Sequence, residues 1–150
     1  MERQIATYED ADLILKLYQL RQEALLRKAR HWLIFDFQPK TADDFFAVVH
    51  GYGSLENDYY RQVLSYWDMA ASLVLHGAIT ADLFFDSNGE GLYILAKFHR
   101  FRKDFEAKTG RAFMRHTAQL IDTYPTAKEI FGTMLKSTEA QASKWSDPAS

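Results

Sequence analysis

Helix-start signals recur along this chain, and each precedes a stretch with apolar residues at helical spacing. Five hydroxyl residues stand three positions before an acid or amide: Thr7 before Asp10, Thr41 before Asp44, Ser54 before Asn57, Ser87 before Glu90 and Thr126 before Glu129. In such a pair the hydroxyl accepts a hydrogen bond from a backbone N–H that the first helical turn leaves free. Helix breakers stand where these stretches end, at Gly51, Gly77, Gly110, Pro39 and Pro125. The sequence therefore predicts an all-α fold.

The apolar residues predict three long helices and four short ones. Long helices are expected over residues 10–32, 54–76 and 90–109, where apolar side chains recur every three or four positions. Short helices are expected over residues 41–50, 80–86, 111–123 and 126 to about 141. We therefore predict an irregular bundle of six to seven helices in a single domain over residues 1–136. Residues 137–150 are mostly small and polar, and we expect them to form a flexible C-terminal tail.

Two segments also fit β-structure. Residues 32–37 read almost as well as a strand, and residues 82–98 could form a hairpin around Asn88-Gly89. Helix is favoured for the second segment, because the apolar residues from Leu92 to Phe105 keep helical spacing and do not alternate.

Composition excludes several classes of protein. The 150 residues contain no cysteine, which excludes a disulfide framework, a Cys-ligated metal and a thiol nucleophile. With 18 basic and 20 acidic side chains the formal charge is −2, so we do not expect nucleic acid as a partner. The longest uncharged run, residues 69–81, falls short of the ~20 residues that cross a bilayer. The first residues lack the basic and apolar regions of a signal peptide. We expect no membrane span and a cytoplasmic location.

Motifs for metal or cofactor chemistry are incomplete. Positions one, three, five and six of a calcium loop are matched by Asp86, Asn88, Glu90 and Gly91. Position twelve should be a Glu that closes the loop, but it is Lys97. None of the five histidines has a Glu three positions before it, as a di-metal carboxylate site in a helical bundle requires. Gly-x-Ser-x-Gly and Walker motifs are also missing. The sequence predicts no metal, no cofactor and no catalytic residue, and it favours a role other than enzyme.

Aromatic residues supply the main hypothesis about function. The chain has 11 Phe, 8 Tyr and 3 Trp, and several stand side by side, as Tyr66 and Trp67 do. Adjacent residues of a helix point about 100° apart, so such a pair cannot face one narrow seam. Some aromatic rings should then line a second surface. Our first hypothesis is a protein-interaction or scaffolding module that self-associates as a homo-oligomer.

Two further hypotheses concern smaller partners. The main alternative is a small-ligand binder or enzyme with an aromatic cleft between helices, lined by Tyr66, Trp67, His76 and His99. A third hypothesis is that an anion or nucleic acid binds the cations Lys97, Arg100 and Lys103, which we expect on the solvent side of their helix. Phe98 and Phe101, interleaved with these cations, should turn inward.

The segment from Val63 to Phe101 carries a recognisable order of elements. The order is an apolar helix with Ser65-Tyr-Trp-Asp-Met-Ala70, a Leu75-His-Gly-Ala-Ile-Thr80 corner, Leu83-Phe-Phe, and then Tyr93-Ile-Leu with Phe98. With this order of elements, the segment resembles an uncharacterised family of small bacterial helical proteins of unknown function. The resemblance covers about a quarter of the chain. The resemblance implies an all-helical fold and brings no catalytic residue.

Overall fold

The computed structural model describes residues 5–145, and every regular element within them is helical. The α-helices are α1 (Tyr8–Arg21), α2 (Ala24–His31), α3 (Ala42–Val49), α4 (Leu55–Leu75), α5 (Ala81–Ser87), α6 (Glu90–Lys97), α7 (Arg102–Thr109), α8 (Arg115–Thr123) and α9 (Pro125–Trp145). A π-helix, η1 (Trp32–Asp36), and a 3-10 helix, η2 (His99–Phe101), complete the described part of the chain. The predicted all-α class is confirmed, with somewhat more helices than the six to seven expected.

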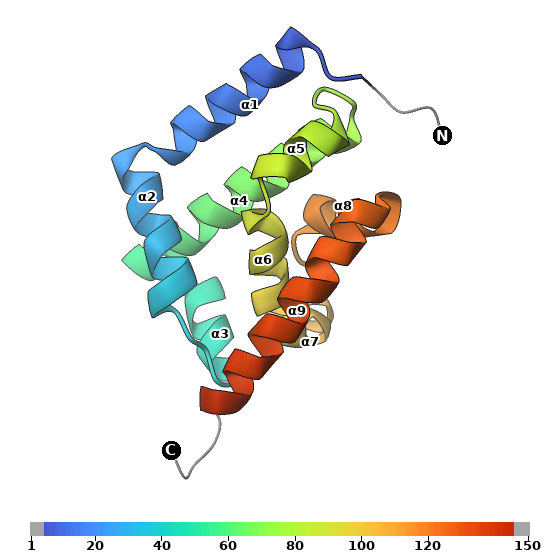
Figure 1. Ribbon diagram of the computed structural model, residues 1–150. Coiled ribbons are helices and arrows are strands. Elements are labelled where there is room, and N and C mark those ends of the chain that lie inside the picture. Colours follow the sequence, from blue (N-terminus) through green and yellow to red (C-terminus); the bar gives the residue numbers. More distant parts are fainter. Residues whose placement is uncertain (1–4, 146–150) are drawn as a thin grey trace.

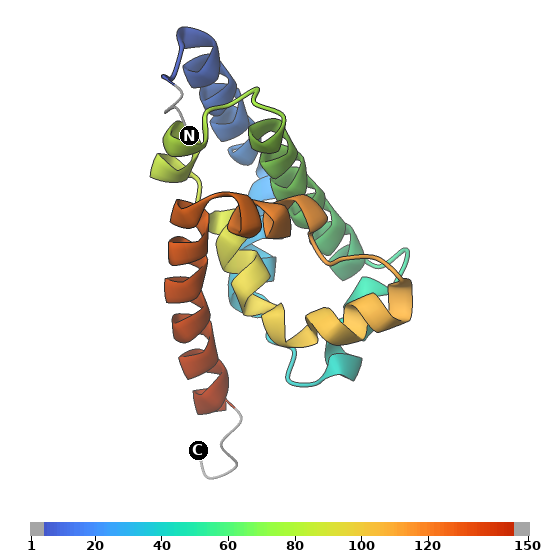
Figure 2. The ribbon, with the colours of Figure 1, turned by 90° about the vertical axis from the view of Figure 1, so that its right-hand side faces the viewer.

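α4 is the central helix of the fold. It packs against α2, α3, α6 and α8, and α6 in turn packs against α9 (Figure 1). The buried face of α4 carries Val63, Trp67, Ala70 and Val74, all exposed by 1 % or less. α1 lies at one edge of the molecule in both views, in contact with α2 and α5 (Figure 2). Among the residues of α1, Asp10 and Leu17 are buried.

Aromatic rings fill the core below α4. The Phe45 ring stacks on Phe101 at 4.8 Å between centroids and contacts Phe98 and Phe113 at 5.3 and 6.0 Å. Each of these four side chains is exposed by 5 % or less. The inward orientation predicted for Phe98 and Phe101 is thus confirmed, and ring pairs of this kind add stability beyond the area they bury.

Three of the five predicted helix starts are confirmed. Thr7 and Asp10 form a reciprocal capping box on α1, and Thr41 and Asp44 form another on α3. Ser54 accepts a hydrogen bond from the Asn57 N–H at the start of α4. The start predicted at Ser87 is wrong, because α6 begins after Gly89, which has no side chain that could cap it. α9 begins at Pro125, one residue before the predicted Thr126, and proline suits the first turn because it has no N–H to satisfy.

Two of the predicted long helices are broken. The helix expected over 10–32 ends at Arg21, and the Glu23 carboxylate then caps α2 by accepting from the Leu25 and Leu26 N–H groups. The helix expected over 90–109 is interrupted after Lys97 by the 3-10 turn η2. That turn brings both Phe98 and Phe101 into the aromatic core. Apolar spacing continues across both breaks, which is why the sequence pattern does not reveal them.

Both β-alternatives are wrong. Residues 82–98 form α5 and α6, and residues 32–36 form the π-helix η1, closed by a 2.8 Å bond from the Phe37 N–H to the Trp32 carbonyl. Lys97 stabilises this π-helix by donating to the Leu33 and Ile34 carbonyls at 2.6 and 3.0 Å. The prediction that Lys97 faces solvent is therefore wrong, since its ammonium is partly buried against these carbonyls.

The C-terminal boundary predicted at residue 136 falls inside α9. Thr138 is 8 % exposed, and its hydroxyl lies 3.4 Å from the Ala96 carbonyl of α6. Residues 146–150 of the predicted tail lie outside the described residues. Within the described part of the chain, no helix has the length and apolar character needed to span a membrane.

Candidate functional site

The seven binding residues predicted from the sequence do not share one cleft. They are Tyr66, Trp67, His76, Lys97, His99, Arg100 and Lys103. Tyr66 and Trp67 are buried in α4, whereas His76 is exposed in the turn that ends this helix. Lys103 is exposed on α7. Lys97, His99 and Arg100 do line a common cavity. Ligand or partner binding by these residues stays a prediction.

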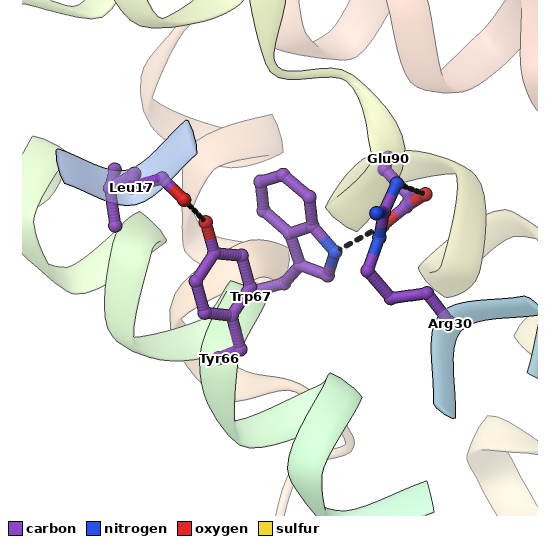
Figure 3. A network of polar contacts seen from close by, with 5 residues as sticks. All are labelled: Leu17, Arg30, Tyr66, Trp67 and Glu90. Carbon is purple, nitrogen blue, oxygen red and sulfur yellow. Dashed lines mark hydrogen bonds and ion pairs between the residues drawn. The ribbon is translucent and has the colours of Figure 1, made fainter. Parts of the chain in front are cut away.

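Tyr66 and Trp67 use their polar atoms inside the fold. The Tyr66 hydroxyl donates to the Leu17 carbonyl of α1, and burial raises its pKa to about 12. The Trp67 indole N–H donates to Oε2 of Glu90 at 2.7 Å (Figure 3). Trp67 is 1 % exposed, so its ring is part of the core. These two residues join α4 to α1 and α6.

Glu90 is the centre of this network. Arg30 of α2 binds its carboxylate with two hydrogen bonds, from Nε at 2.7 Å and from Nη2 at 2.8 Å (Figure 3). The bonds to Glu90 raise the pKa of Arg30. The sequence analysis uses Glu90 only in a predicted helix start and in an incomplete calcium loop, whereas the position of Arg30 indicates that it faces the core. It stands four positions after Leu26 and three before Leu33, both buried, and therefore on the inner face.

The cavity shared by Lys97, His99 and Arg100 is small. It holds about 70 Å³ between α6, α9 and the Gln38-Pro39 segment. Both cations in its wall are hydrogen-bonded to the backbone, because Lys97 donates to two carbonyls of η1 and Arg100 donates to the Pro39 carbonyl. Burial lowers the pKa of Lys97 to about 8, and it also lowers that of His99. Since one water takes about 30 Å³ of the liquid, this cavity suits a few waters at most.

A larger groove lies between α4, α7 and α8. It encloses about 670 Å³ and is lined by twelve residues, among which Asp68 and His116 are in direct contact. Nδ1 of His116 lies 2.8 Å from Oδ2 of Asp68. Oδ1 of Asp68 accepts from both the backbone N–H and the hydroxyl of Thr117, at 3.0 and 3.1 Å. Asp68 therefore caps α8 from another helix and fixes the His116 ring at the same time.

The outer face of α1 is a second candidate surface. Tyr8, Leu15 and Tyr18 are 96, 61 and 51 % exposed, while Leu17 on the opposite face is 4 % exposed. We call Tyr8, Ala11, Leu15 and Tyr18 the α1 stripe. Its members recur at intervals of three and four positions, which places them within about 80° of arc around the helix. The stripe is not apparent in the sequence, because the apolar residues of both faces merge into one wide pattern.

The described residues offer no metal centre, since no three His, Asp or Glu side chains among them lie close enough to hold an ion.

No curated protein and no solved structure shows significant similarity to this chain. A family model described as a domain of unknown function (DUF4760) matches residues 6–124, which include α1 to α8. The predicted relation to an uncharacterised family is therefore confirmed, whereas a bacterial origin stays a prediction. With most of its length covered by this match, the chain belongs to the DUF4760 family.

Proposed function

We propose that this domain is a protein-interaction module that self-associates through the α1 stripe. The single observation that carries the proposal is the exposure of Tyr8, Leu15 and Tyr18 on a helix whose other face is already buried. Tyrosine is enriched at protein interfaces because its ring supplies large contact area and its hydroxyl stays hydrated. A helix with two apolar faces needs one partner for each face.

The spacing of the stripe suits a second helix. The members of the stripe are separated by three, four and three positions. This is the spacing at which the side chains of two packed helices interlock. The surface is that of one short helix, which fits a weak, reversible dimer better than an obligate one.

The charges on α1 favour another copy of the same helix in antiparallel orientation. Glu9 and Asp12 lie in its first half and Lys16 lies in its second half, whereas the Arg21 guanidinium lies over the buried Trp67 ring. In a two-fold pair centred midway between Ala11 and Leu15, Lys16 of each copy lies opposite the acidic half of the other. Lys16 and Asp12 already form a 3.2 Å ion pair within one chain, with both side chains 64 % exposed. Such exposed charges select the orientation more than they add affinity.

Sedimentation equilibrium of the wild-type chain at micromolar concentration tests the proposal. We expect a reversible monomer–dimer equilibrium, which Leu15→Glu shifts toward monomer by at least about tenfold in Kd, because a buried unpaired charge is costly. Leu55→Glu is the matched control, since Leu55 is 57 % exposed at the start of α4 and lies outside the stripe. A strictly monomeric wild type, or equal effects of the two variants, would overturn the proposal.

A further inference from the structure

We infer that the groove between α4, α7 and α8 binds a small amphipathic anion, with an apolar body and a carboxylate head group. The groove is separate from the α1 stripe, so this inference does not depend on the proposed self-association. Its volume of about 670 Å³ lies within the range of small-molecule sites, about 300–1,000 Å³. Its wall combines an apolar part and a basic part.

The apolar part of the wall comes from α4, α7 and the loop before α8. Tyr60 and Leu64 of α4 are 6 and 9 % exposed, and Phe113 and Met114 of the loop are 1 and 7 % exposed. Phe105 of α7 packs edge-on against Phe113 at 5.2 Å between centroids. Burial raises the pKa of Tyr60, so its phenol stays neutral in the physiological range. This part of the groove suits an alkyl or aryl group and offers no fixed negative charge to repel the head group.

The basic part of the wall consists of Arg111, Arg115 and His116. Both arginines are exposed and line the groove together. A guanidinium binds a carboxylate with two parallel hydrogen bonds, which makes arginine the most suitable cation for this head group. The acid in the groove, Asp68, accepts three hydrogen bonds, from His116 Nδ1 and from the N–H and hydroxyl of Thr117. Its oxygens are therefore occupied by donors of the fold, and among the lining residues two arginines stand against this one acid.

The His116 ring is held in a defined orientation. Its Nδ1 is bound to Asp68, and its Nε2 lies 3.4 Å from Nη2 of Arg115. With Nδ1 donating to Asp68, Nε2 accepts from this guanidinium. The imidazole therefore helps to hold Arg115 at the groove, where the arginine can bind a carboxylate head group. Fixed polar groups of this kind orient ligands in otherwise apolar sites.

The backbone next to these residues is strained. Met114 has φ +46°, and it is the one non-glycine residue with positive φ among the described residues. This conformation is strained for a residue with a side chain, and such strain is concentrated at active sites and ligand-binding sites. The left-handed turn at Met114 buries its own side chain in the groove and begins α8 with Arg115 and His116 at the entrance. The strained turn thus positions the residues that the inferred ligand would contact.

Titration of the ¹⁵N-labelled full-length chain with decanoate, followed by amide chemical shifts, tests the inference. We expect saturable shifts at low-millimolar decanoate, concentrated in residues 110–117 and around Tyr60 and Leu64. Decanol, which has the same chain length and no charge, should bind at least about tenfold more weakly. The double substitution Arg111→Gln with Arg115→Gln should raise the decanoate Kd by a similar factor. The matched control is Arg27→Gln with Lys28→Gln, a pair of exposed cations on α2, and it should leave the Kd unchanged.

Three outcomes would overturn the inference. One is the absence of shifts with decanoate at low-millimolar concentration in a chain whose spectrum shows it folded. Another is equal affinity for decanol and decanoate, which would mean unspecific apolar adhesion. The third is a set of shifts confined to α1, which would place the ligand on the α1 stripe. The sedimentation experiment measures self-association and does not depend on ligand binding. A negative result of the decanoate titration therefore does not contradict the proposed self-association, and a monomeric chain would not contradict ligand binding.

Discussion

Trp67 and Asp68 are consecutive residues of α4, and they take part in two polar networks on different sides of that helix. Trp67 donates to Glu90, which also binds Arg30 of α2, while Asp68 binds His116 and Thr117 of α8. The charged pairs have similar side-chain exposure, 21 and 15 % for Arg30 and Glu90 against 27 and 24 % for His116 and Asp68. Burial therefore does not distinguish them.

What differs is where each network ends. In the Glu90 network, Arg30 binds both carboxylate oxygens and the Trp67 indole N–H donates to one of them, so the bonds of Glu90 are made within the fold. In the Asp68 network, the chain of contacts leads through His116 to the exposed Arg115 guanidinium at the edge of a groove. A closed network adds stability and specifies packing, whereas an open one presents a positioned polar atom to a ligand. We therefore expect substitutions in the first network to affect stability more than those in the second.

Glu90→Ala should give the largest effect. It leaves the Arg30 guanidinium and the Trp67 N–H without an acceptor at partly buried positions, and we expect a loss of about 2–4 kcal/mol in the free energy of unfolding. Urea denaturation followed by tryptophan fluorescence measures this loss. Glu90→Gln is the conservative comparison: it keeps an acceptor for Trp67 and should cost less than Glu90→Ala.

Asp68→Ala should cost less, about 1–2 kcal/mol, because the main structural interaction that it removes is the cap on α8. Asp68→Asn should change the free energy of unfolding little, since asparagine caps helices about as well as aspartate. The same urea titration compares both variants with the Glu90 series. A loss for Asp68→Ala as large as that for Glu90→Ala would break the distinction between closed and open networks.

Local contacts account for the parts of the fold that the sequence predicts correctly. The caps at Thr7, Thr41 and Ser54 join residues three positions apart, so a short window of sequence contains the whole interaction. The breaks after Arg21 and Lys97 depend instead on which residues meet in the core. Phe98 and Phe101 both face inward, as helical spacing predicts, but no residue near them in the sequence indicates the 3-10 turn His99–Phe101.

The candidate site could not be predicted for the same reason, at longer range. Asp68 and His116 are 48 positions apart, and Arg30 and Glu90 are 60 positions apart. The sequence pattern puts Asp68 on the polar side of α4, which is correct, but the pattern does not show that α8 covers that side. His116 has no residue nearby in the sequence that identifies it as part of a pair. The positive φ of Met114 carries no sequence signal either, because methionine has no preference for that conformation.

Two helical glycines test how closely the Glu90 network is packed. A Cβ at Gly91 would lie 3.2 Å from Cβ of Trp67, whereas a Cβ at Gly132 in α9 would meet nothing within 4 Å. Replacing glycine by alanine in a helix gains up to about 1 kcal/mol, and overpacking costs about 1–3 kcal/mol. Gly132→Ala should therefore raise the melting temperature, while Gly91→Ala should lower it slightly. Equal stabilisation by both would show that α4 and α6 have room to spare beside Trp67.

Asp10 is a third carboxylate that joins distant parts of the chain, and it extends the comparison to pH. Its Oδ2 accepts from the Thr7 N–H at 2.7 Å, and its Oδ1 accepts from the Thr80 N–H at the start of α5 at 3.2 Å. The backbone bond from Thr7 contributes most to holding the pKa of Asp10 below its ordinary value, against the opposing effect of burial. This network is closed, as that of Glu90 is, so Asp10 should act on stability.

The direction of the pH effect follows from that shift. With a native pKa below the unfolded one, the native state binds fewer protons, so the stabilisation is complete above the unfolded pKa, at about pH 4 and higher. It is lost as the pH falls through the native pKa. Asp10→Asn should therefore flatten the fall in urea midpoint below about pH 4, whereas Asp12→Asn, at a 64 % exposed carboxylate of the same helix, should leave it unchanged. Identical acid limbs for wild type and Asp10→Asn would mean that α1 is held to α5 by apolar contact alone, and the closed-network account would then apply to Glu90 but not to this helix.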